Sequence, residues 1–161
     1  MAREEEPREN LIAEATALVE RVELLASGQQ EPIVAGFRRE GSLSLFFGDD
    51  PVYQFNAARQ LRRAYVGGRL YKAAGGRLLE ITRERDAARL HLASRELTPA
   101  ESARFVAGLQ SLLDGLATKL RGGQVQVVAT VPSDADVVGR LELWLAEQGA
   151  HVEIALTPNA R

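Results

Sequence analysis

The sequence predicts an α+β fold for this chain of 161 residues. Short β-prone runs separated by turn residues fill residues 33–97, which is typical of an antiparallel meander. A helix-start signal at Thr98 opens a long amphipathic run, and a strand–helix–strand pattern follows it. All six prolines fall where these elements begin or end, so the separate signals agree with one another.

An amphipathic helix is predicted over residues 8–27. Its apolar residues recur at steps of four and three, and Gly28 follows as a terminator. The stripe consists of Leu11, Ala15, Leu18, Val22 and Leu25. We expect this helix to pack on the sheet, because fewer than three heptads are too few to require a coiled coil.

The central meander is predicted to hold five to seven strands. The β-prone runs are residues 33–39, 43–47, 52–55, 61–66, 69–73, 77–83 and 89–93. Two-residue breaks such as Gly67-Gly68 suit tight hairpins, whose central residues need positive φ. Residues 56–63 are ambiguous, because they would also form one or two helical turns.

The long helix is predicted to run from Thr98 to about Arg121. Thr98 is a suitable N-cap, Pro99 suits the first helical position, and Glu101 completes a capping box. Gly108 and Gly115 lie on one line of this helix, and a close approach of another backbone would explain their presence.

The C-terminal part is predicted to be a βαβ-like unit. Residues 125–131 are apolar enough for a buried strand, Ser133 caps a helix that reaches about Gln148, and residues 151–156 alternate like a strand. Two strands joined in this way are normally parallel, with a right-handed crossover.

Charge divides the chain into three segments, which we interpret as parts of one compact domain. Residues 1–32, the acidic N-terminal segment, carry 3 basic and 8 acidic side chains. Residues 33–97, the β region, carry 12 basic and 7 acidic side chains, a net of +5. Residues 98–161 carry 5 basic and 7 acidic side chains. Clustered cations attract anionic partners, although acidic helices packed near a basic sheet would give the same pattern.

The scarcity of cysteine and histidine narrows the classes of function that the sequence predicts. The chain has no cysteine and only two histidines, His91 and His151, which are 60 residues apart and lack neighbours at catalytic spacing. We interpret both as surface residues. Neither standard phosphate-binding glycine motif is present, so no cofactor is predicted.

No apolar run is long enough for a membrane span and the N-terminus is acidic, so we expect a cytoplasmic protein.

Asp49 and Asp50 form the most suggestive acidic pair. Adjacent carboxylates at a strand end can hold a magnesium or calcium ion, which would suit a metal-dependent hydrolase. The tetrapeptide Gly48-Asp49-Asp50-Pro51 is also ordinary turn sequence. We favour the turn and keep the hydrolase as the alternative function.

Basic and aromatic residues interleave in the β region, and this pattern predicts the main function. Six of the nine aromatic residues fall between residues 46 and 71. The candidate anion-binding residues are Arg38, Arg39, Arg59, Arg62, Arg63, Arg69 and Lys72, and the candidate stacking residues are Tyr53 and Tyr65. Such a sheet suits a non-catalytic binding or adaptor protein with an anionic partner, either nucleic acid or an acidic protein. Core packing with an incidental basic face would fit the same residues. A structural homo-oligomer joined through the helices is a further alternative function.

Overall fold

A computed structural model describes residues 20–38, 41–48, 51–58, 60–86, 89–131 and 134–148. Its elements are β1 (Glu20–Ala26), β2 (Ile33–Phe37), β3 (Leu43–Phe47), β4 (Val52–Phe55), β5 (Leu61–Val66), β6 (Arg69–Ala74), β7 (Arg77–Asp86), β8 (Arg89–Glu96), α2 (Pro99–Arg121), β9 (Val125–Val131) and α3 (Asp134–Gln148).

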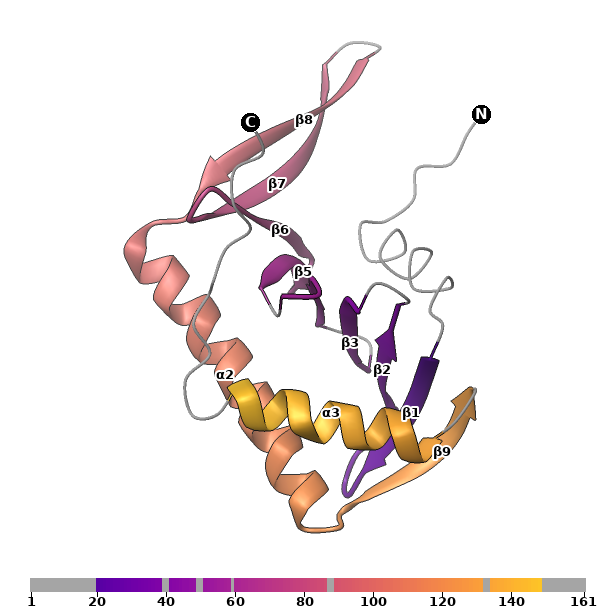
Figure 1. Cartoon of the computed structure of the whole chain (residues 1–161). Coiled ribbons are helices and arrows are strands. Elements are labelled where there is room, and N and C mark those ends of the chain that lie inside the picture. Colours follow the sequence, from indigo (N-terminus) through magenta and orange to yellow (C-terminus); the bar gives the residue numbers. More distant parts are fainter. Residues whose placement is uncertain are drawn as a thin grey trace.

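The described strands form one antiparallel sheet in the order β8-β7-β6-β5-β4-β3-β2-β1-β9. Eight of them follow the chain as a meander, and β9 adds to the outer side of β1. Both helices, α2 and α3, lie across one side of this sheet (Figure 1). The fold is therefore mixed α and β, as predicted, with the sheet dominant.

The predicted N-terminal helix is wrong over residues 20–26, which form β1. The segment alternates, with Val22, Leu24 and Ala26 buried and the residues between them less so. Strands β2 and β9 pair with β1 on both sides and supply its backbone hydrogen bonds. This pairing outweighs the local helical spacing, because propensity is a weak prior against tertiary contacts. Residues 8–19 of the predicted helix lie outside the described residues.

The predicted meander is confirmed, with seven strands between residues 33 and 97. The ends of the predicted runs shift by at most three residues. Gly67 and Gly68 have φ values of 58° and 79°, the conformation that a tight hairpin turn requires. In the ambiguous segment, the side-chain oxygen of Asn56 accepts hydrogen bonds from the backbone N–H groups of Ala58 and Gln60. This local turn leads directly into β5 at Leu61.

The capping box that was predicted for α2 is present. The Thr98 hydroxyl accepts a hydrogen bond from the Glu101 N–H at 3.2 Å, and the Glu101 carboxylate accepts one from the Thr98 N–H at 2.8 Å. Pro99 occupies the first turn, and Gly122 caps the C-terminus. Local sequence therefore determines both ends of this helix.

Thr98→Ala should lower the free energy of unfolding by about 1 kcal/mol, the usual cost of losing an N-cap side chain. Chemical denaturation of the two proteins measures the difference. Thr98→Ser, which keeps the hydroxyl, should retain most of the stability. Equal losses in the two variants would mean that the hydroxyl has no capping role.

The close backbone approach that was expected at the two glycines of α2 is not found among the described residues. A Cβ atom added at Gly108 or Gly115 would meet none of their atoms within 4 Å. Both glycines are exposed, and the helix turns Leu109, Leu113 and Leu116 toward the sheet instead.

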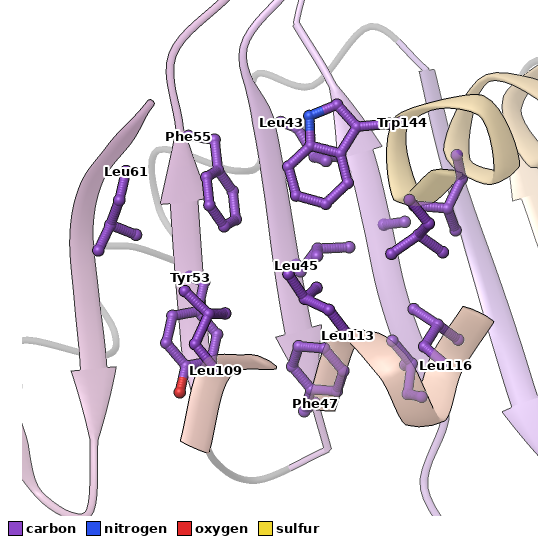
Figure 2. Packing of buried hydrophobic residues seen from close by; sticks show 14 of the residues in the cluster. Leu43, Leu45, Phe47, Tyr53, Phe55, Leu61, Leu109, Leu113, Leu116 and Trp144 are labelled. Atoms are coloured by element: carbon purple, nitrogen blue, oxygen red, sulfur yellow. The ribbon is translucent and has the colours of Figure 1, made fainter. Parts of the chain in front are cut away.

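Buried side chains from the sheet and both helices form the core (Figure 2). Tyr53 of β4 lies in edge contact with Phe105 of α2, with 6.0 Å between the ring centroids. Phe55 of β4 lies against Trp144 of α3, at 4.8 Å. The two helices therefore pack over neighbouring positions of one strand, and we call this side of the sheet the helix face.

The C-terminal unit is confirmed in part. β9 and α3 occupy the predicted ranges, whereas residues 149–161, including the last predicted strand, lie outside the described residues. β9 was expected to be buried, yet Val128 is 53% exposed. The reason is its place at one end of the described sheet, where only β1 pairs with it. Neither described helix is long and apolar enough to cross a membrane.

Candidate functional site

Strand register divides the predicted cationic residues between the two faces of the sheet. Arg63 of β5 pairs directly with Lys72 of β6, and Arg63 also pairs with Gln54 of β4. These three residues alternate with the core residues and lie on the side opposite the helices, which we call the second face. Arg69 pairs with Val66 and lies on the helix face, 3.8 Å from the Glu80 carboxylate.

Carboxylates neutralise two other arginines of the β region. Arg77 pairs with Glu96 across β7 and β8 at 3.2 Å. Arg95 contacts Glu80 and Glu101, both at 2.8 Å. The net charge of +5 is therefore only partly available to a partner, because these arginines belong to local ion pairs.

Three of the candidate cations, Arg62, Arg63 and Lys72, lie on β5 and β6. The Arg63 guanidinium donates from Nε and Nη2 to the side-chain oxygen of Gln54, at 3.0 Å and 2.7 Å. Arg62 occupies a bulge beside it, where the register with β4 shifts. Both Arg62 and Lys72 are exposed, and neither forms a hydrogen bond or ion pair with the residues that the structure describes.

Apolar side chains adjoin these cations on the second face. Phe46 of β3 and Val52 of β4 form a small buried cluster, and three partly buried residues pack against it: Val34, Tyr65 and Leu70. We use the name β5–β6 patch for Arg62, Arg63, Tyr65, Leu70 and Lys72. This patch has an aromatic ring at the edge of an apolar cluster, two cations on the same face, and Arg62 in the adjoining bulge.

The two candidate stacking residues occupy different environments. Tyr65 is partly buried on the second face. Tyr53 is only 2% exposed, and Phe47 and Phe105 contact its ring. Tyr53 is thus a core residue of the helix face, and the patch does not include it.

Three other candidates lie away from the patch or outside the described residues. Arg38 follows β2 in the β2–β3 turn, where its N–H donates to the Ser42 carbonyl at 3.0 Å. Arg39 and Arg59 are outside the described residues. The sequence grouped Arg38 with the residues of the patch by proximity along the chain, whereas the sheet order places β2 three strands from β5.

The candidate metal ligands Asp49 and Asp50 also lie outside the described residues, as does His151. The flanking backbone is described, and the Phe47 N–H donates to the Pro51 carbonyl at 2.9 Å. His91 belongs to β8. Among the described residues, no group of His, Asp and Glu side chains could hold a metal ion.

Gln54 is the residue that sequence reasoning missed. It is 3% exposed on the second face, and its amide orients Arg63. The signal was present as a single polar residue among the apolar residues of β4, on the side away from Tyr53 and Phe55. A buried amide needs a hydrogen-bonding partner, and Arg63 provides one.

A network around Arg95 attaches the start of α2 to the sheet. Hydrogen bonds from Arg95, followed by the one from the Thr98 N–H, lower the pKa of Glu101 to about 2. The same carboxylates, Glu101 first and Glu80 second, raise the pKa of Arg95 above its ordinary value. Because Arg95 is exposed and both carboxylates are partly buried near the start of α2, we interpret the network as a positioning device for this helix.

This network predicts a pH dependence of stability. The folded-state pKa of Glu101 is depressed, so its carboxylate stabilises the fold above the ordinary value of 4.5 and loses that effect as the pH falls toward about 2. The difference in melting temperature between the parent and Glu101→Gln should be greatest at neutral pH and should disappear at the acidic end. Thermal unfolding across this range measures it. Glu142→Gln, at an exposed position of α3, is the matched control, and a constant difference for Glu101→Gln would contradict the prediction.

Comparison of the chain with protein-family models, with curated proteins and with solved structures finds no match.

Proposed function

We propose that this protein is a non-catalytic binding module whose β5–β6 patch contacts an anionic partner. The observation that carries the proposal is the direct pairing of Arg63 with Lys72. Like charges that face each other across two strands are destabilising. A bound anion that contacts both side chains would oppose this repulsion and gain charge-assisted hydrogen bonds.

Single-stranded nucleic acid is the partner class that we propose. Tyr65 lies two residues after Arg63 on the same face of β5, so that a base could contact the ring while a phosphate contacts the cations. An acidic protein segment would use the cations alone. The two partners differ in their dependence on Tyr65.

The triple variant Arg62→Gln, Arg63→Gln and Lys72→Gln should lower affinity for a short single-stranded oligonucleotide by about tenfold or more. Each neutralised phosphate contributes about 0.7 to the slope of log affinity against log salt, so three lost contacts should reduce the slope by about 2. Fluorescence titration at low and physiological salt measures both quantities.

A matched control carries the same charge change on α2: Arg104→Gln, Lys119→Gln and Arg121→Gln. This control should leave affinity and slope close to those of the parent. Equal effects of the two triple variants would show that net charge alone governs binding. Tyr65→Leu should weaken oligonucleotide binding at constant slope, whereas binding of polyglutamate but no oligonucleotide would instead identify an acidic protein partner.

A further inference from the structure

The two central strands are buried on both faces, although the described helices pack on only one. Every residue of β3 and β4 is buried. On the second face, Val52 is 1% exposed, and Ser44 and Gln54 are both 3% exposed. An antiparallel sheet with one solvated face would expose alternate residues of its strands. This part of the second face therefore requires a cover.

The covered area has two parallel rows. One row crosses the sheet through Gly36, Ser44 and Gln54, which are in register with one another. The neighbouring row contains Phe46 and Val52. We call these five residues the central strip. Its apolar row offers side-chain contacts, and its small residues allow another chain segment to approach the sheet closely.

We propose that the acidic chain segment formed by residues 1–19 covers the central strip. It joins β1 at Glu20, and Arg21 is in register with Gly36 at the start of the strip. Strands lie about 4.8 Å apart, so β3 and β4 are about 10 Å and 14 Å from β1. Nineteen residues span about 28 Å even when fully helical, which is more than this distance.

The composition of the segment matches the surface. Leu11, Ala15 and Leu18 recur at a spacing that places them on one side of a helix, so they can meet the apolar row together. The segment carries five glutamates and two arginines, and the strip borders Arg63 and Lys72. Opposite charges can thus meet at the edge of the apolar contact, where an anionic partner of Arg63 and Lys72 would compete with these glutamates.

The other undescribed terminus is a poorer candidate. Residues 149–161 follow α3, which packs on the helix face through Leu141, Trp144 and Leu145. To reach the strip, they would have to pass around an edge of the sheet. The N-terminal segment is joined directly to β1, a strand of the sheet, and therefore needs no such path.

Cysteine labelling tests the cover directly, because the chain has no cysteine of its own. Ser44→Cys reports on the strip, Leu45→Cys on the helix face, and Lys72→Cys on an exposed position. We expect the thiol at position 44 to react with a maleimide at least tenfold more slowly than that at position 72. The additional substitutions Leu11→Asp and Leu18→Asp place charge on the apolar side of the segment. They should raise the labelling rate at position 44 at least tenfold, whereas the labelling rate at position 45 should stay low.

An unchanged rate at position 44 would overturn the proposal, as would an increase produced instead by deletion of residues 149–161. If the thiol at position 45 also becomes reactive, the two aspartate substitutions have disrupted the core and the labelling result does not test the cover. A paramagnetic spin label then provides the test. A spin label at Ala15→Cys should broaden the backbone amide signals of Ser44, Phe46 and Gln54 in the otherwise unchanged chain. Broadening confined to other strands would refute the assignment. Neither experiment includes an anionic partner, so the result is independent of the proposed function.

Discussion

Phe55→Ala should lower the free energy of unfolding by about 3–5 kcal/mol, the usual cost of truncating a buried aromatic ring. Phe55 is fully enclosed in the core, and its ring lies against Trp144 with an interplanar angle of 64°. The substitution would leave a cavity between β4 and α3. Denaturant unfolding followed by circular dichroism measures the loss.

Phe55→Leu is the control, because it keeps much of the apolar volume and should cost less than Phe55→Ala. A double-mutant cycle with Trp144→Ala should show a coupling of about 0.5–1.5 kcal/mol, as for other edge-to-face pairs. A loss below about 1 kcal/mol for Phe55→Ala would show that α3 does not pack on β4 in solution.

Leu24→Ala should cost about 2–5 kcal/mol, whereas Leu25→Ala should cost clearly less. In β1, Leu24 is fully buried on the helix face, and Leu25 is only partly buried on the other side. The amphipathic helix that local spacing suggested would place Leu25 in its apolar stripe and leave Leu24 outside it. Denaturant unfolding of the two variants therefore distinguishes strand from helix, and a larger loss for Leu25→Ala would contradict the strand.

Elements that are specified by a few neighbouring residues could be predicted from sequence. Thr98, Pro99 and Glu101 specify the start of α2 because their hydrogen bonds connect residues within one turn. The hairpin turn at Gly67 and Gly68 could be predicted for the same reason, since it depends only on the backbone conformation of these two residues. For the same reason the boundaries of β3, β4 and β5 were predicted to the residue.

The candidate site could be predicted only in part. Sequence proximity brought Arg62, Arg63, Lys72 and Tyr65 into one list, and the register of β5 and β6 places the last three on one face. The same list contained Tyr53 and Arg69, which lie on the helix face. Alternation within a strand tells which residues share a side, but the side that the helices cover depends on how the strands are ordered and packed.

By itself, the sequence determined the ends of α2, the tight turns and the succession of strands from β2 to β8, because neighbours along the chain supply the energies that specify them. Tertiary structure decided whether residues 20–26 form a helix or a strand, since two partner strands that are distant in sequence supply their hydrogen bonds. It also decided which arginines form ion pairs, because Glu80 and Glu96 reach their arginines only across paired strands. Both outcomes depend on contacts between distant parts of the chain, which local patterns do not encode.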